Sequence, residues 1–176
     1  LQMSMELLDS QYPGNLAGVI CEPIPSSGGV LEMPPGYFSA LKNELDKRNA
    51  LLIFDEAQTG LGKVGTMYCY QQEGVVPDII TLSKHFGGGL AISAMITSTE
   101  IEEKVVNDGL SFGHSHSADP IGCVAGLASL EEILEEDIPG KARKLGKSWQ
   151  ERMQALQQRY ELIGEVRGRG CLQGLE

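Results

Sequence analysis

The sequence has no long hydrophobic run and little positive charge. Its apolar stretches, such as 16–24 and 51–54, stay far below the roughly 20 residues that a membrane-spanning helix needs. Only 14 Lys and Arg residues stand against 24 Asp and Glu residues, which gives a net charge of −10. Because so acidic a chain repels phosphate backbones, we expect no nucleic-acid partner. Because its apolar stretches are short, we expect no membrane partner either.

Cysteine is scarce and scattered. The four cysteines form no Cys-x-x-Cys pair, so they indicate neither a zinc site nor a dense disulfide framework; they are Cys21, Cys69, Cys123 and Cys171. We expect buried free thiols in a reducing compartment, which favours the cytoplasm. The acidic stretches 100–103 and 131–137 indicate solvated helix faces, because no oxygen-rich loop accompanies them.

The chain also lacks an initiating methionine. It begins at Leu1 and stops at Glu176, directly after the strand-like stretch "GCLQGL". We therefore expect an internal fragment, in which the absence of a signal peptide says nothing about targeting. Its 176 residues, 41% of them hydrophobic, suffice for one ordinary domain or for part of a larger one.

What the sequence does contain is a series of short apolar strands. They are predicted within residues 16–24, 50–57, 75–84 and 90–98, and a helix over 34–49 separates the first two. Continuous apolar strands of this kind predict an α/β fold with a mostly parallel sheet covered on both faces. Farther along, we expect a long helix over 115–136, a second over 140–160, and two short strands within 161–176.

Chemically reactive side chains follow three of the predicted strands. Glu22, with Ser26 and Ser27, follows the first strand, Asp55 follows the second, and Lys84 follows the third. Ligands of open α/β sheets bind outside the carboxyl ends of the strands, so these groups can converge on one site. A lysine that forms an imine and a carboxylate that keeps a pyridine nitrogen protonated are the groups that pyridoxal phosphate requires.

The stretch "LLIFDEAQTG" (51–60) has a second interpretation, as the metal-binding strand of a P-loop ATPase or helicase. That interpretation needs a G-x-x-x-x-G-K-[ST] phosphate loop, and residues 1–54 supply none. The nearby "GLGKVG" fails because Val64 follows Lys63. The loop could lie upstream of Leu1, so this alternative stays open, although the acidic charge disfavours a helicase.

Four stretches, in chain order, resemble the class III pyridoxal-phosphate aminotransferases: "EPI" (22–24), "LLIFDEAQTGLGKVGTM" (51–67), "PDIITLSKHFGGGL" (77–90) and "VRGRGCLQGLE" (166–176). The resemblance implies a fold-type-I α/β structure. Residues 1–125 would form the later part of the large cofactor-binding domain, and 126–176 the beginning of a small α+β C-terminal domain. It also implies a homodimer or homotetramer, because this family builds its site across a subunit interface.

More narrowly, "CEPIPSSGGVLEMPPGYFSALK" (21–42) and "HSADP" (116–120) resemble the 2,2-dialkylglycine decarboxylases. Ornithine- and aminobutyrate-type relatives typically carry Gln-Gly-Glu-Gly-Gly where this chain has "PSSGG" (25–29). The implied reaction couples decarboxylation of a 2,2-dialkylglycine to amino transfer onto a 2-oxo acid such as pyruvate, giving CO2, a ketone and an amino acid. A class III aminotransferase of the ω-amino acid or ornithine type, without loss of CO2, is the alternative.

The resemblance also implies roles for individual residues around the cofactor. Lys84 would bond covalently to pyridoxal phosphate and move protons. Asp55 would pair with the ring nitrogen, and Gln58 would hydrogen-bond the phenolic oxygen. For Arg167 and Arg169 we expect structural roles, because the family's substrate-carboxylate arginine lies nearer the C-terminus, beyond Glu176.

Further implied roles belong to a serine loop and to the stretch around 115–119. Ser27 would line the pocket from which the substrate carboxylate leaves. Ser115 would reach the phosphate of the cofactor bound in the partner subunit. Ser115, Ser117 and Asp119 also match positions that hold an alkali-metal ion, K+ or Na+, in the decarboxylases.

Overall fold

A four-stranded sheet forms the centre of the computed structural model, which describes residues 1–12, 14, 16–111 and 113–176. The strands, in sheet order, are β1 (Gly18–Cys21), β2 (Leu51–Asp55), β3 (Ile79–Leu82) and β4 (Ala94–Thr97). The first three are parallel to one another, whereas β4 runs antiparallel to β3. The predicted mostly parallel sheet is confirmed, but the strand expected over 90–98 keeps only four residues.

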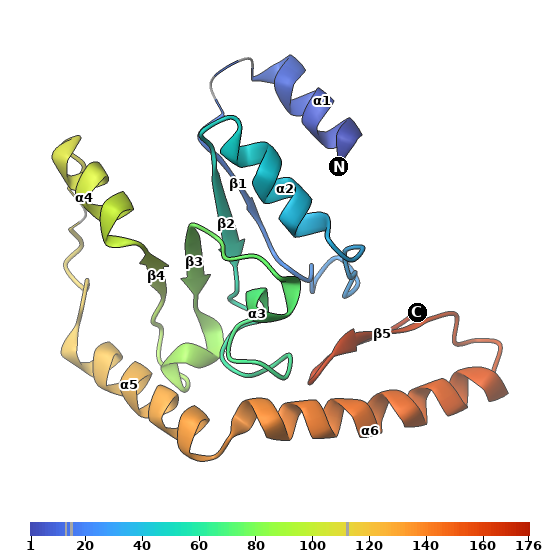
Figure 1. The fold of residues 1–176 in the computed structure, drawn as a ribbon. Coiled ribbons are helices and arrows are strands. Elements are labelled where there is room, and N and C mark those ends of the chain that lie inside the picture. The colour runs from blue at the N-terminus through green and yellow to red at the C-terminus, as the bar shows by residue number, and fades with distance from the viewer. Residues whose placement is uncertain (13, 15, 112) are drawn as a thin grey trace.

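Helices lie on both sides of this sheet and below it in the view of Figure 1. They are α1 (Gln2–Gln11), α2 (Tyr37–Asp46), α3 (Tyr70–Glu73), α4 (Thr99–Asn107), α5 (Pro120–Glu135) and α6 (Ile138–Arg159). The sequence prediction assigned no structure to α1, of which only Met5 is buried. The helices predicted over 115–136 and 140–160 are present as α5 and α6, and the predicted domain division at 125/126 falls inside α5.

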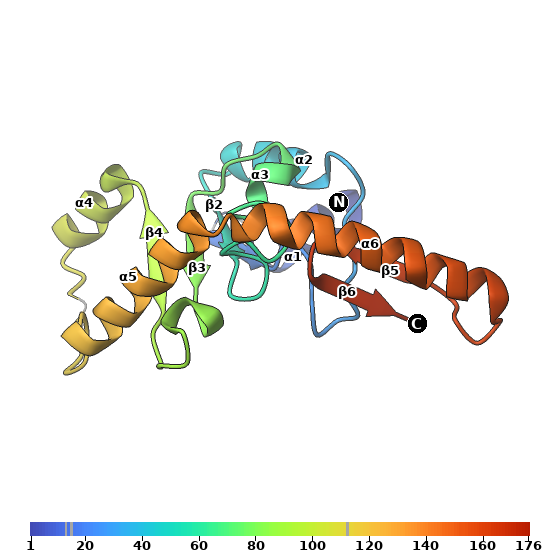
Figure 2. The ribbon, with the colours of Figure 1, turned by 90° about the horizontal axis from the view of Figure 1, so that it is seen from below.

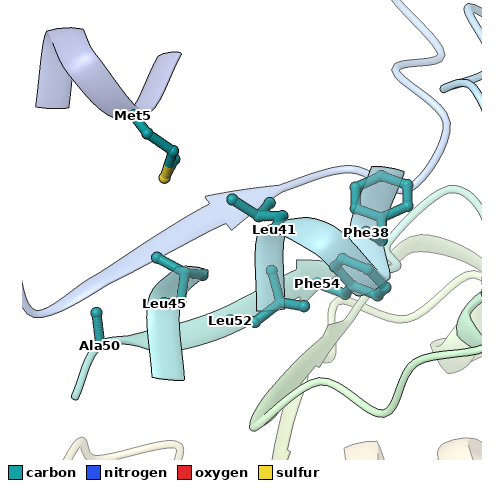
Figure 3. Packing of buried hydrophobic residues seen from close by; sticks show 7 residues of the cluster. All are labelled: Met5, Phe38, Leu41, Leu45, Ala50, Leu52 and Phe54. Carbon is teal, nitrogen blue, oxygen red and sulfur yellow. The ribbon is translucent and has the colours of Figure 1, made fainter. Parts of the chain in front are cut away.

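The main hydrophobic core lies between α2 and β2 (Figure 3). Its buried members are Met5, Phe38, Leu41, Leu45, Ala50, Leu52 and Phe54. The rings of Phe38 and Phe54 meet edge to face, with their centroids 4.8 Å apart. Because burying one large apolar side chain contributes roughly 1.5–3 kcal/mol, this cluster fixes β2 firmly against α2. The residue that ends β2, Asp55, is thereby held in place.

A C-terminal hairpin packs beside α6, as Figure 2 shows. It consists of β5 (Val166–Arg169) and β6 (Leu172–Leu175), which pair antiparallel. Gly146 of α6 lies so close to Gly170 that a Cβ atom added at position 146 would come within 2.2 Å of the Gly170 carbonyl oxygen. The crossing of helix and hairpin therefore requires glycine at position 146.

Both hairpin arginines lie in ion pairs. Arg169 contacts Glu32 at 2.6 Å and Glu73 at 2.5 Å. Arg167 pairs with Glu165 and Glu176 and donates to the Gly29 carbonyl oxygen at 2.6 Å. The bonds from Arg167 to Gly29 and from Arg169 to Glu32 and Glu73 join the C-terminal hairpin to segments more than 90 residues away in the chain.

The surface confirms one composition-based expectation and corrects another. The acidic side chains of 100–103 and 131–137 are exposed; they lie on α4, on the end of α5 and at the junction between α5 and α6. Cys69 is buried, but Cys123 and Cys171 are exposed, so the prediction of buried thiols is wrong for these two. Cys123 lies on an exposed face of α5 and Cys171 in the turn of the hairpin. The sequence around a cysteine does not indicate that its side chain is exposed in such a place. Within the described ranges, no helix is both long and apolar enough to cross a membrane.

Candidate active site

The carboxyl ends of β1, β2 and β3 meet at one edge of the sheet. In Figure 1 these strands point toward α5 and α6. Cys21 pairs in register with Phe54, and Asp55 pairs with Thr81, so Glu22 and Asp55 leave neighbouring strands side by side. Lys84 follows two residues after β3 ends. The structure thus brings Glu22, Asp55 and Lys84 to the same sheet edge, as the strand pattern predicts.

Asp55 is half-buried and anchored through one of its carboxylate oxygens. Its Oδ1 atom accepts hydrogen bonds from the Ala57 amide at 3.0 Å and from the Thr81 hydroxyl at 3.1 Å. Both hydrogen bonds that the structure assigns to this side chain end on Oδ1. The carboxylate is therefore oriented by its own loop and by the neighbouring strand.

The next residue, Glu56, points into the interior, with only 1% of its surface exposed. Its carboxylate accepts from the amides of Cys69 at 2.7 Å and Tyr70 at 2.9 Å, and from the Thr59 hydroxyl at 3.0 Å. Burial raises the pKa of Glu56, while these three donors act in the opposite direction. Glu56 therefore fastens the loop after β2 and the start of α3 beneath Asp55.

Sequence reasoning did not single out Glu56. A signal for it exists, because successive side chains of a strand point to opposite sides. If Asp55 faces a ligand at the strand end, the residue that follows tends to face the core. A carboxylate at that position then needs several hydrogen-bond donors, and the loop amides supply them.

Gln58 is held by a lysine from the same loop. Lys63 Nζ donates to Gln58 Oε1 at 3.2 Å, so the carbonyl oxygen of the Gln58 amide is engaged by Lys63 and its NH2 group takes no part in this bond. The backbone carbonyl of Lys63 accepts in turn from the Cys171 amide at 2.8 Å. The turn of the C-terminal hairpin thus steadies the loop that carries Gln58.

Lys84 is exposed and begins a short 3-10 turn, η1 (Lys84–Gly87). Its backbone has φ of 55°, in the left-handed region. The lysine lines a hollow of about 490 Å³ together with Ser83 and residues 89–93. The chain therefore presents an amine at the mouth of an open space beside the sheet edge.

His85 is half-buried, in contrast to its exposed neighbour Lys84. Its Nε2 atom lies 3.0 Å from the Gly60 carbonyl oxygen, and burial lowers the pKa of its imidazole. This contact ties η1 to the loop after β2. His85 accordingly has a packing role in this chain.

The serine loop after β1 is organised by Glu22. Its Oε2 atom accepts from the amide of Ser26 at 3.2 Å and from the hydroxyl of the same residue at 3.1 Å. The Val30 amide donates to the Pro25 carbonyl oxygen at 3.0 Å and closes the loop. Ser27, between these anchors, is exposed. Its hydroxyl is therefore available at the surface of the loop.

Residues 114–119 form a separate exposed turn before α5. The His114 amide donates to Ser117 Oγ at 3.2 Å, and Asp119 Oδ2 lies 3.3 Å from His116 Nδ1. Asp119 Oδ1 accepts from the Ile121 amide at 3.2 Å and caps α5. Ser115 is exposed within the turn. In the part of the chain that the structure describes, no three His, Cys, Asp or Glu side chains are grouped for a metal ion.

This turn borders a second hollow of about 880 Å³, between the segment 90–94 and α5. Ser117 and Asp119 line this second hollow. Residues 90–93 line both this hollow and the one at Lys84. The structure therefore places six of the predicted residues in two neighbouring groups, and Ser27 in the serine loop after β1. Asp55, Gln58 and Lys84 belong to the strand edge, and Ser115, Ser117 and Asp119 belong to the turn.

Comparison with known proteins gives consistent results. The family model for class-III aminotransferases matches residues 2–176. An aminotransferase from Schizosaccharomyces pombe is 42% identical over the whole chain, which covers 39% of that protein. A leucine/methionine racemase from Thermococcus litoralis is 39% identical over 94% of the chain, covering 37% of the racemase.

A solved structure gives the same result for the fold. The taurine:2-oxoglutarate aminotransferase from Bifidobacterium kashiwanohense, in complex with pyridoxal phosphate and glutamate, superposes with a TM-score of 0.93 at 26% identity. The superposition covers 99% of this chain and 39% of that one. The chain thus spans less than half the length of the relatives that it matches.

Proposed function

The chain belongs to the class-III aminotransferase family, and we propose that the whole protein transfers amino groups between an amino donor and a 2-oxo acid, using pyridoxal phosphate. The observation that carries this proposal is the pairing of β2 with β3, which places Asp55 and Lys84 at one edge of the sheet. An anchored carboxylate and an exposed amine at the ends of adjacent strands are the two groups that this cofactor needs from a protein. The aminotransferases among the similar proteins support the same activity.

The residues of the sheet edge fit pyridoxal phosphate. Asp55 has Oδ1 engaged by two donors, which leaves its other oxygen for the N–H of a protonated ring nitrogen. Gln58 has its carbonyl oxygen engaged by Lys63, which leaves its NH2 group for a phenolic oxygen. Lys84 offers its amine at the open hollow. When bound, the cofactor supplies an electron-accepting ring.

Each of these residues then has a definite task. Asp55 keeps the proton on the ring nitrogen, so that the ring stays able to accept electrons. Gln58 orients the ring by its hydrogen bond. Lys84 would bond covalently to the resting cofactor. Once released by the substrate, its amine would move the proton from the substrate carbon that bears nitrogen to the cofactor carbon that Lys84 had held. These roles rest on the family and on the donor and acceptor atoms at the sheet edge.

The sequence interpretation favours decarboxylation. We favour amino transfer without loss of CO2 instead, because the family and the similar aminotransferases support it better. Decarboxylation of a 2,2-dialkylglycine is a second candidate. It is favoured by the serine loop, in which Glu22 binds Ser26 and leaves Ser27 exposed. In this candidate, Ser27 lines the pocket from which the carboxylate leaves.

Absorbance and product analysis of the full-length protein test both candidates. The wild-type protein should take up pyridoxal phosphate and show its visible absorbance, and Lys84→Ala should alter that absorbance and abolish turnover. A wild-type protein that never takes up the cofactor contradicts the proposal. Release of CO2 from 2-aminoisobutyrate and pyruvate would identify the decarboxylase, and racemisation of leucine without amino transfer would identify a racemase.

We propose further that the whole protein is a homodimer or homotetramer in which the turn 114–119 meets the partner subunit. Large apolar side chains of α5 close to this turn, Ile121 and Val124, are exposed. Light scattering of the full-length protein gives the subunit number, and a monomer contradicts this proposal. The alkali-metal role of Ser115, Ser117 and Asp119 stays a prediction; replacing K+ by a large organic cation should lower activity if it is correct.

A further inference from the structure

We infer that Thr81 is a positioning residue of the cofactor site, and that it acts through Asp55. The Thr81 hydroxyl fixes which carboxylate oxygen of Asp55 remains for the ring nitrogen of the cofactor. This inference rests on the proposed function, because the contact between Asp55 and a ring nitrogen exists only when pyridoxal phosphate is bound. Thr81 lies within the stretch 77–90, which contains one strand of the sheet, and its role follows from the strand pairing.

The register of the sheet brings the two side chains together. Asp55 and Thr81 are paired residues of the parallel strands β2 and β3, and the Thr81 hydroxyl donates to Asp55 Oδ1 at 3.1 Å. Thr81 lies between the buried Ile80 and Leu82, which hold its strand in the core. Because a β-branched side chain has few χ1 states, the hydroxyl has little freedom to turn away.

Two donors on one oxygen restrict the Asp55 carboxylate. The χ2 torsion of an aspartate is broad and roughly two-fold, so a single hydrogen bond leaves either oxygen free to face a ligand. The Ala57 amide approaches Oδ1 from the loop, and the Thr81 hydroxyl approaches the same atom from β3. Together they orient the carboxylate before the cofactor arrives, which lowers the ordering cost of binding.

Thr81→Val is the variant that tests this role, because valine keeps the shape of threonine and removes the hydroxyl. We expect the apo form of the full-length Thr81→Val protein to bind pyridoxal phosphate about tenfold more weakly, since one hydrogen bond to a charged group is lost. The affinity is measured by absorbance titration of apoprotein, without any turnover. The pH at which the bound cofactor changes its spectrum should also shift, because the ring-nitrogen partner is less well oriented.

Thr97→Val is a matched control on the neighbouring strand. The Thr97 hydroxyl donates to the Asp78 carbonyl oxygen at 3.0 Å, so this change also removes one strand hydroxyl and one hydrogen bond. Thr97 pairs with Ile79, at the end of β3 opposite to Lys84. Thr97→Val should therefore leave the cofactor affinity and the spectral pH profile as in the wild type.

Rescue by serine separates positioning from packing. Thr81→Ser keeps the hydroxyl and should bind the cofactor within about twofold of the wild type. Should Thr81→Val fail to fold, Thr81→Ala compared with Thr81→Ser makes the same test with two small side chains. Equal affinities of the hydroxyl-bearing and hydroxyl-free variants overturn the inference. A wild-type protein that binds no pyridoxal phosphate overturns the proposed function, and this inference falls with it.

Discussion

The two groups of site residues are held in opposite ways. At the strand edge, Asp55 and Glu56 bind partners from distant parts of the chain, such as Thr81 and Cys69. In the turn 114–119, the bonds of Ser117 and Asp119 stay within three residues, and the side chains are exposed. The long-range bonds of the strand edge therefore lie within this chain and follow from the packing of the core. The hydrogen bonds of these turn side chains, by contrast, are local.

The largest expected effect comes from the interior of the strand edge. Glu56→Ala removes a buried carboxylate and leaves three donors without an acceptor, two amides and the Thr59 hydroxyl. We expect a loss of roughly 3–5 kcal/mol in the free energy of unfolding, measured by urea denaturation of the full-length protein. The exposed Glu102→Ala on α4 is the control, with an expected change below about 0.5 kcal/mol. Equal losses of unfolding free energy in Glu56→Ala and Glu102→Ala would contradict the structural role of the buried Glu56 carboxylate.

A smaller effect is expected at the base of the turn. Asp119→Ala removes the side chain that caps α5, so the free energy of unfolding should fall by about 1 kcal/mol. Asp108→Ala is the matched control, because Asp108 lies at the C-terminal end of α4, where a carboxylate caps nothing. If Asp119→Ala lowered the free energy of unfolding as much as Glu56→Ala does, the turn would be stabilised by more than its local hydrogen bonds.

Ser115→Ala should change function without changing stability. The side chain is exposed, so we expect the free energy of unfolding to stay within about 0.5 kcal/mol of the wild type. If Ser115 reaches the cofactor phosphate of a partner subunit, the same variant should bind pyridoxal phosphate several-fold more weakly in absorbance titrations. Unchanged affinity would remove Ser115 from the site and leave the turn with a capping role alone.

The smallest effect concerns the acid sensitivity of the strand edge. Burial lowers the pKa of His85 below its usual 6.5, so the unfolded chain takes up a proton at higher pH than the folded protein. The contribution of His85 to stability is therefore complete above pH 6.5 and is lost as the pH falls through the lowered pKa. His85→Gln keeps a donor for the Gly60 carbonyl and should flatten the fall of the unfolding midpoint below pH 6.5. A wild-type slope in the variant would exclude His85 as its source.

The position of the strand edge can be predicted from the sequence, because apolar runs mark the strands and reactive side chains follow directly after them. Apolar runs followed by Asp55 and Lys84 identify two parallel strands and the groups at their ends. Thr81 was not predicted, because threonine is common in strands for its shape. Its hydroxyl contacts Asp55 only because of the register between β2 and β3. Residue identity alone does not specify that register.

Other features depend on long-range packing that no local pattern encodes. The reversed direction of β4 follows from the path of residues 83–93, which turn back beside β3. Helix α1 has Met5 as its buried residue, so it lacks the apolar stripe by which α2 is identified from Leu41 and Leu45. The ion pairs of Arg169 with Glu32 and Glu73 join residues whose proximity only the folded chain creates.

The left-handed backbone at Lys84 restricts which substitutions can be compared fairly at that position. A φ of 55° is uncommon for residues other than glycine, and asparagine adopts it more readily than alanine. Lys84→Ala therefore changes the conformational preference of η1 in addition to removing the amine. Lys84→Asn removes the amine and keeps a residue suited to the turn. The difference between the two variants measures how much of the turn's shape the backbone determines, separately from any chemistry of the lysine.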